Sequence, residues 1–183
     1  HMMSVGYDMY LKILQEAVSE EKGEQVQKKA DCSADLLVSA YIPQTYMPKD
    51  EERMDVYRRI AHVRTEEDAD DIIDELVDRY GDIPRSVNVL IRIALLRGQA
   101  AEAGITDISQ KKDVLRFKLS DFDLKRVSAL YQRPEYKNAI KVEAGSDPAV
   151  SVKIKQGGDV IKIASDFVRN YVTALGGDDA AKK

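Results

Sequence analysis

The hydrophobic residues of this chain change their spacing halfway along the sequence, and this change limits the class of fold. Through residues 50–104 the apolar side chains recur every three or four positions, which is the period of a helix that buries one face. Through residues 114–154 they alternate with polar ones, as Leu115, Phe117 and Leu119 do, and alternation is typical of a half-buried strand. We therefore expect an α+β fold in which a helical layer packs on a small, mainly antiparallel sheet.

Capping and turn residues divide the two halves into elements. Pro43 stops the first strand, Gly81 ends the helix that Thr65 begins, and the turn at 157–159 starts the last helix. The predicted strands are 35–42, 105–108, 114–119, 138–142 and 150–154. The predicted helices begin at Asp50, Thr65, Asp82, Ser120 and Asp159.

The polar and apolar segments also predict how the chain is divided. Residues 1–18 are expected to form a helical arm that needs a partner surface, because residues 5–18 are amphipathic. The apolar side of this segment carries Tyr7, Tyr10, Leu11, Leu14 and Val18. Residues 19–34 lose all periodicity and predict a flexible linker, residues 35–177 predict the compact domain, and residues 178–183 predict a disordered polar tail. His1 and Met2 are typical of an expression tag, and the abrupt helical start predicts a fragment.

The helix predicted over 65–82 carries an unusual concentration of like charge. The carboxylates opposite its apolar side are Asp71, Asp74, Glu75 and Asp78, and we call these residues the acidic face. Each like-charged neighbouring pair costs a helix roughly 0.2–0.5 kcal/mol, so interspersed lysines would serve solubility better. We interpret the acidic face as one half of an electrostatic interface with a basic partner. The alternative is a solvated face that binds nothing.

The overall charge argues against general binding to nucleic acid. The formal net charge is −4, and residues 65–83 hold nine acids and one base, which gives −8 there and +4 elsewhere. A weakly acidic chain of this kind is a poor general ligand for phosphate backbones. Arg53, Arg58, Arg59 and Arg64 form a modest basic run, which we interpret as offsetting the neighbouring acids. Contact with DNA through Arg53, Arg58 and Arg59 is the alternative.

The sequence offers no constellation of catalytic, metal-binding or cofactor-binding residues, so we do not expect an enzyme. His62 has no Cys, His or carboxylate companion at ligand spacing, and we assign it a structural or surface role without a metal. Cys32 lies in the predicted linker, where a single cysteine fits a reducing cytosol and is not expected to act as a nucleophile. Gly157 and Gly158 lack the spacing of a phosphate-binding loop. No apolar run approaches the about 20 residues that span a membrane, so we expect a cytoplasmic protein without membrane contact.

Five blocks of sequence carry a resemblance to a known family. They are V-G-Y-D-M-Y-L-K-I-L-Q-E-A-V at 5–18, A-Y-I-P-Q-T-Y-M-P at 40–48, R-M-D-V-Y-R-R-I-A at 53–61, E-L-V-D-R-Y-G-D-I-P at 75–84 and A-G-I at 103–105. In this order and at these spacings they resemble the C-terminal end of the bacterial transcription-repair coupling factors. The first block resembles the tail of the family's translocation-coupling motif. From 106 to 183 only the order of the elements supports the resemblance.

The resemblance implies a regulatory function. Full-length members of the family are ATP-driven double-stranded-DNA translocases that displace stalled RNA polymerase and recruit UvrA for nucleotide excision repair. ATP and Mg belong to motor modules that are missing here, so no cofactor is expected in this chain. The C-terminal domain of the family is an inhibitory clamp that masks the N-terminal UvrA-binding module of the same protein, through acidic residues that fall on Glu75 and Asp78. The alternative is a recruitment module that binds RNA polymerase or a repair protein directly.

Overall fold

The computed structural model describes residues 31–176 of the 183-residue chain. The elements in chain order are β1 (Ser33–Asp35), α2 (Asp50–Ala61), α3 (Glu66–Tyr80), α4 (Arg85–Glu102), β2 (Ile105–Lys111), β3 (Val114–Leu119), α5 (Leu124–Tyr131), β4 (Ile140–Glu143), β5 (Ala149–Lys153) and α6 (Val160–Val172). The predicted arm at 1–18, most of the predicted linker and the predicted tail at 178–183 lie outside the described residues.

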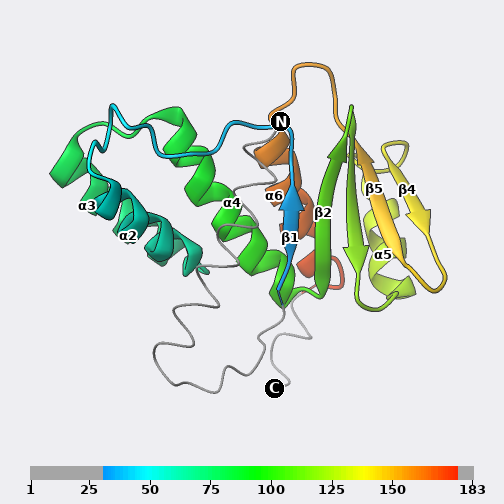
Figure 1. Ribbon diagram of the computed structural model, residues 1–183. Coiled ribbons are helices and arrows are strands. Elements are labelled where there is room, and N and C mark those ends of the chain that lie inside the picture. The colour runs from blue at the N-terminus through cyan, green and yellow to red at the C-terminus, as the bar shows by residue number, and fades with distance from the viewer. Residues whose placement is uncertain (1–30, 177–183) are drawn as a thin grey trace.

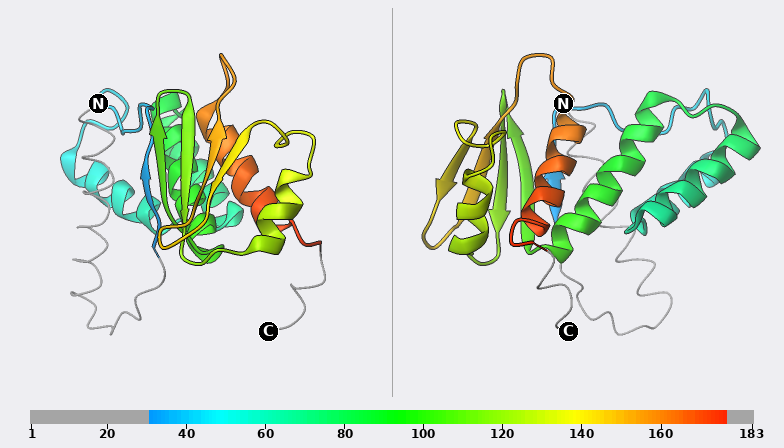
Figure 2. Two further views of the ribbon diagram at one scale, coloured as in Figure 1. Left: turned by 90° about the vertical axis from the view of Figure 1, so that its right-hand side faces the viewer. Right: turned by 180° about the vertical axis from the view of Figure 1, so that it is seen from behind.

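The strands form one sheet in the order β1-β2-β3-β5-β4, and every neighbouring pair is antiparallel except β1 with β2. Alternation along β3 separates the two faces of this sheet, because Leu115, Phe117 and Leu119 are buried whereas the residues between them are partly exposed. The Phe117 ring stacks on Phe167 of α6, with ring centroids 4.1 Å apart. The left view of Figure 2 shows the other face of the sheet with no helix in front of it. The α+β fold that the sequence predicts is thus confirmed.

Helix α4 joins the sheet to the remaining helices. It packs against β1, β2 and α6 on one side and against α2 and α3 on the other. This double contact explains why α4 is apolar around most of its circumference, with Leu90, Ile91 and Leu96 fully buried. Figure 1 shows α2 and α3 beyond α4, away from the sheet, so these two helices form one end of the molecule.

The start and end of α3 follow from local chemistry that the sequence predicts. The Thr65 hydroxyl oxygen accepts a hydrogen bond from the Asp68 backbone N–H at 3.1 Å, and the Asp68 carboxylate accepts one from the Thr65 N–H at 3.0 Å. This reciprocal capping box satisfies donors that the first helical turn leaves unpaired. Gly81 ends the helix with φ of 81°, a conformation that costs glycine little.

The strand predicted over 35–42 is wrong, because only Ser33–Asp35 forms β1. The Val38 N–H donates to the Leu36 carbonyl at 2.9 Å, and this tight turn takes the chain out of the sheet. Beyond the turn, Ile42 is buried and its backbone N–H donates to the Tyr57 hydroxyl of α2 at 2.8 Å. Apolar residues that could have paired in a sheet instead cover the helices.

Other boundaries also differ from the sequence prediction. Cys32 and Ala34 are buried in the domain, so the linker predicted to end at 34 cannot include them. Strand β2 continues to Lys111, well beyond the predicted end at 108, because its residues keep pairing with β3 up to the turn at 112–113. Helix α5 is capped by Asp123 and not by Ser120, since the Asp123 carboxylate accepts from the Arg126 N–H at 3.1 Å.

Candidate functional site

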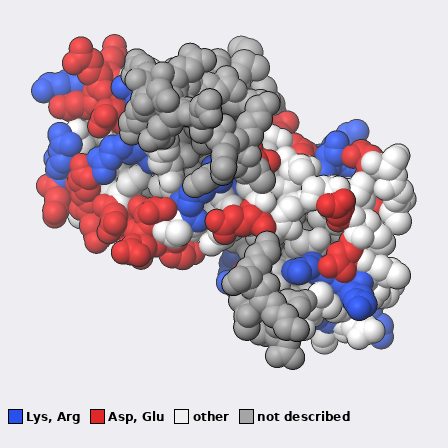
Figure 3. Space-filling model, turned by 90° about the horizontal axis from the view of Figure 1, so that it is seen from below, with Lys and Arg blue, Asp and Glu red and all other residues white. Residues whose placement is uncertain are grey.

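The acidic face lies on the outer side of α3. Ala69, Ile72 and Leu76 are buried against the neighbouring helices, and this burial turns the opposite side of α3 to solvent. Asp71, Asp74 and Asp78 are exposed, whereas Glu75 is half-buried. Figure 3 shows acidic side chains gathered over the end of the molecule that α2 and α3 form. The face therefore lies on a surface that another protein or domain can reach.

Glu75 differs from the other three acids because it has partners within the domain. Arg59 of α2 donates from Nη1 to Glu75 Oε1 at 2.7 Å and from Nη2 to Glu75 Oε2. Arg79, one turn along α3, places its Nη1 3.6 Å from the same Oε1. The hydrogen bonds from Arg59 lower the pKa of Glu75, although burial acts in the opposite direction. Glu75 thus joins α2 to α3 as a charged, fixed side chain.

The three aspartates of the acidic face have no such compensation. None of Asp71, Asp74 and Asp78 makes an ion pair or a side-chain hydrogen bond with any residue in 31–176. They follow one another at i, i+3 and i+7, so each adds to the repulsion felt by the next and by Glu75. This is a surface whose energy falls when a cation approaches it.

Two of the three arginines assigned to a basic contact are occupied within the domain. Arg53 donates to the carbonyls of Met47 at 2.8 Å and Pro48 at 3.1 Å, and it also pairs with Asp50. Its side chain is only 13% exposed, and these hydrogen bonds hold the loop before α2 against the helix. Arg59 is held by Glu75. Arg58 is exposed and has no ion pair within the described residues, so the three arginines do not form a joint basic surface.

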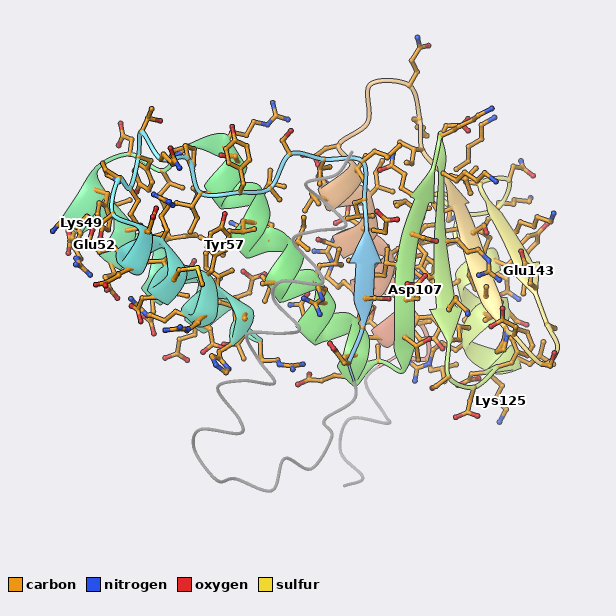
Figure 4. All side chains as sticks on the ribbon, in the orientation of Figure 1. Lys49, Glu52, Tyr57, Asp107, Lys125 and Glu143 are labelled. Atoms are coloured by element: carbon orange, nitrogen blue, oxygen red, sulfur yellow. The ribbon has the colours of Figure 1, made fainter. Side chains whose placement is uncertain are left out.

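Acidic residues of α2 extend the charged surface, and the sequence did not predict that they belong to it. Asp55 is exposed and lies one turn before Arg59, whose pKa it helps to raise together with Glu75. Glu52 accepts a hydrogen bond from the Tyr80 hydroxyl at 3.0 Å and lies 3.5 Å from Lys49, and Figure 4 shows Lys49 and Glu52 together at the outer end of α2. The helical spacing of Asp55 and Arg59 could have indicated Asp55. The contact of Glu52 with Tyr80 depends on how α2 packs on α3, so spacing could not have indicated it.

The His, Cys, Asp and Glu residues of the described part of the chain were candidates for a metal site. Residues 31–176 contain no group of three His, Cys, Asp or Glu placed to hold a metal ion. His62 is exposed at the end of α2. Cys32 is buried and its thiol donates to the Ser33 carbonyl at 3.4 Å, so it is part of the core and not of a tether. None of the helices in 31–176 has the length and apolarity needed to span a bilayer.

Comparison with known proteins identifies relatives of this domain. The TRCF domain, a protein family, matches residues 36–129, which is about half of the chain. The chain is 34% identical over 119 residues to a transcription-repair-coupling factor of Bacillus subtilis (strain 168), and the match covers 64% of this chain and 10% of that protein. A transcription-repair-coupling factor of Staphylococcus haemolyticus matches with the same identity and coverage, and one of Staphylococcus aureus (strain USA300) is 33% identical. The chain therefore spans about a tenth of the length of the curated relatives it matches.

A solved structure supports the fold independently. The crystal structure of a C-terminal domain of transcription-repair coupling factor superimposes with a TM-score of 0.68 and 16% sequence identity. The superposition covers 81% of this chain and 94% of that one. The α+β arrangement is thus shared over nearly the whole of the solved domain, although most of its side chains differ.

Proposed function

The chain belongs to the TRCF-domain family, and from this premise we propose that it is the autoinhibitory C-terminal domain of a transcription-repair coupling factor. In the proposed resting state, its acidic face docks on the N-terminal UvrA-binding module of the same protein and masks it. The full-length protein is proposed to be an ATP-driven double-stranded-DNA translocase that displaces stalled RNA polymerase and recruits UvrA for nucleotide excision repair. ATP and Mg are then bound by motor modules outside this chain.

The observation that carries this proposal is the uncompensated charge of Asp71, Asp74 and Asp78 beside a fixed Glu75. Arg59 occupies one acceptor direction on each Glu75 oxygen, and a carboxylate has about four such directions, so Glu75 can still accept from a partner. The side chain is 38% exposed, which leaves that approach open. A docking surface that presents arginines fits best, because a guanidinium can bind a carboxylate through two parallel hydrogen bonds.

A contact of this kind suits an interdomain latch, by which we mean a weak interface that masks the UvrA-binding module and separates when the protein is activated. An exposed ion pair contributes about 0.2–1 kcal/mol, so several together give a weak interface. Two modules of one protein need no more than that, because their connection within one chain provides an effective concentration that can reach the order of millimolar. When polymerase and DNA engage the rest of the molecule, the strain on the linker is proposed to separate the two modules and expose the UvrA-binding surface.

A binding titration against the N-terminal module tests the docking step. We expect the affinity of this chain for the module to fall as salt is raised, because the contact depends on charge. The double change Asp74→Asn and Asp78→Asn should weaken binding roughly 2- to 30-fold, the effect of losing about 0.4–2 kcal/mol. The matched control is Asp113→Asn with Glu135→Gln, which removes two exposed acids outside α2 and α3. Equal affinities for all three proteins would refute docking through the acidic face.

The regulatory step needs a second test in the full-length protein. Charge reversal of Asp78 should raise both the basal ATPase rate and UvrA binding, since it opens the latch without removing the pair between Glu75 and Arg59. Reversal of Glu75 as well should add to the effect but also disturbs the packing of α2 on α3. If both assays were unchanged in the Asp78→Lys protein, the domain would not act as an inhibitory clamp.

The main alternative is a recruitment module that uses the same exposed aspartates to bind RNA polymerase or a repair protein directly. Capture of such a protein by this chain alone, in the absence of the N-terminal module, would favour it. Accessory contact with DNA is less well supported, because Arg53 and Arg59 have partners within the domain and only Arg58 is exposed. A salt-dependent shift of duplex DNA by this chain would be the result that favours that contact.

A further inference from the structure

A wide groove lies on the far side of the domain from the open face of the sheet. Its walls are α4 and α6, which lie side by side in the right view of Figure 2, and the loop after β1 closes one end. The groove has a volume of about 1640 Å³. Pockets for small molecules have volumes of about 300–1,000 Å³, so this groove is of the size that takes a peptide.

The groove gathers exposed apolar side chains. Seven large hydrophobic residues of the described chain are exposed, and four of them line this one groove. These four are Leu37 (47% exposed), Tyr41 (39%), Val172 (50%) and Leu175 (36%). Apolar residues scattered singly over a surface need no explanation, but a cluster in one groove is typical of a binding site for another apolar surface.

The two ends of the chain differ in their ability to cover this surface. The C-terminal residues 177–183 follow the groove directly but read G-D-D-A-A-K-K, with no large apolar side chain. The N-terminal segment 5–18 lies outside the described residues, and its sequence carries apolar residues at helical spacing, namely Tyr7, Tyr10, Leu11, Leu14 and Val18. We propose that residues 5–18 dock as an amphipathic helix in the groove between α4 and α6 of the same chain.

The dimensions of the chain agree with this docking. The described chain begins against α4, where Arg97 Nε donates to the Cys32 carbonyl at 2.7 Å and Arg97 pairs with Asp31 at 3.3 Å. Residues 19–30 can extend over roughly 40 Å, at about 3.3 Å per residue, which is enough to cross the width of α4. The apolar stripe from Tyr7 to Val18 is about 17 Å long in a helix, close to the about 20 Å length of α6. An amphipathic helix in an apolar groove is a common mode of peptide recognition.

Hydrogen exchange of the whole chain tests the inference. We expect the backbone amides of residues 5–18 to be protected, and Val172→Lys to reduce that protection roughly tenfold or more, because burial of a valine side chain contributes on this scale. The control is Tyr131→Lys, since Tyr131 is also 50% exposed and also ends a helix but does not line the groove. Protection of the interior of α4 verifies that each variant is folded. If Val172→Lys does not fold, Leu37→Lys replaces it as the test variant.

Three results would overturn the inference. The first is an absence of protection in residues 5–18 of the unmodified chain. The second is protection that Val172→Lys and Leu37→Lys leave unchanged, which would place the segment elsewhere. The third is protection that disappears on dilution together with a dimer in sedimentation experiments, which would show that a second copy fills the groove. The test makes no use of the acidic face, so its failure leaves the proposed latch standing.

Discussion

Arg59 of α2 donates hydrogen bonds to Glu75 of α3 from both terminal nitrogens of its guanidinium, with Nη1 2.7 Å from Oε1. This pair links two helices that form one end of the molecule, and it fixes the carboxylate of Glu75 in place. Asp78, three residues further along α3, has no corresponding partner in residues 31–176. The two residues that the family resemblance assigns to one contact therefore differ in role, because Glu75 also holds the helices together and Asp78 does not.

We predict that Glu75→Gln destabilises the domain near neutral pH and has less effect in acid. The pair with Arg59 lowers the pKa of Glu75 in the folded state, so its stabilisation is present above roughly pH 5 and is lost as the pH falls through the folded pKa. Both side chains are 38% exposed, so solvent screening limits the loss near pH 7 to about 1 kcal/mol. Urea denaturation near pH 7 and near pH 3 measures the difference.

The change Arg59→Gln should give a similar loss near pH 7. Glu75 raises the pKa of Arg59, and this contribution persists up to the ordinary pKa of arginine, so it does not vary between pH 5 and 9. Glu135→Gln is the control, because Glu135 is exposed and outside the two helices. A loss in Glu75→Gln that is as large near pH 3 as near pH 7 would show that Glu75 acts through packing and not through its charge.

We predict that Asp78→Lys stabilises the isolated domain. It removes repulsion with Asp74 and Glu75, creates an i,i+4 attraction from Asp74, and places a cation in the last turn of α3. Contributions of roughly 0.2–0.5 kcal/mol each give a total of about 1 kcal/mol, which corresponds to a rise in Tm of about 2–4 °C for a domain of this size. Calorimetry of the two proteins measures the shift.

Asp113→Lys provides the matched control, since it makes the same charge change at an exposed turn between β2 and β3. Its stability should stay within about 0.5 kcal/mol of the unmodified protein. A lower Tm for Asp78→Lys would mean that Asp78 makes a favourable contact within the domain. A higher Tm combined with weaker docking would show that the acidic face is kept for binding at a cost in stability.

Elements whose determinants lie within a few residues are predictable from this sequence. The start of α3 at Thr65 and the alternation of β3 are local, and the structure confirms both, with Thr65 and Asp68 forming a capping box. The strand predicted over 35–42 failed for a physical reason. An alternating apolar segment can pair in a sheet or cover a helix, and the choice depends on the turn after Leu36 and on a distant Tyr57 hydroxyl.

The candidate site shows the same limit. Helical spacing predicts that Asp71, Asp74, Glu75 and Asp78 share one side of α3, and burial of Ala69, Ile72 and Leu76 turns that side outward. Spacing within α3 cannot predict that Glu75 alone meets Arg59, because that contact is set by how α2 crosses α3. The sequence thus predicts which acids lie together but not which of them is already paired.

We predict that Thr65→Ala destabilises the domain by about 1 kcal/mol, the usual effect of losing an N-cap side chain. The Asp68 backbone N–H donates to the Thr65 hydroxyl at 3.1 Å, and the substitution removes this acceptor. Hydrogen exchange at the first turn of α3 should rise together with the drop in stability. Thr45→Ala is the control, because Thr45 lies in an exposed loop. Equal losses in both variants would show that the cap does not stabilise α3.

We predict that Gly98→Ala destabilises the domain even though alanine favours helices by about 1 kcal/mol over glycine. A Cβ at Gly98 of α4 would lie 3.1 Å from the Arg64 Cα and 3.4 Å from the Val63 carbonyl oxygen. Arg64 cannot easily move away, because its backbone N–H donates to the Asp68 carboxylate at 3.0 Å within the cap of α3. The added methyl group therefore pushes α3 away from α4.

The clash should outweigh the gain in helix propensity, because close-packed cores resist even one extra carbon atom and overpacking costs about 1–3 kcal/mol. Asn88→Ala separates the two effects, since Asn88 is an exposed position of α4 where propensity acts without a clash. Thermal unfolding should give a lower Tm for Gly98→Ala and an equal or higher one for Asn88→Ala. If Gly98→Ala also raised the Tm, the connection between α2 and α3 would have to move without a cost in stability, and α3 would not be held rigidly against α4.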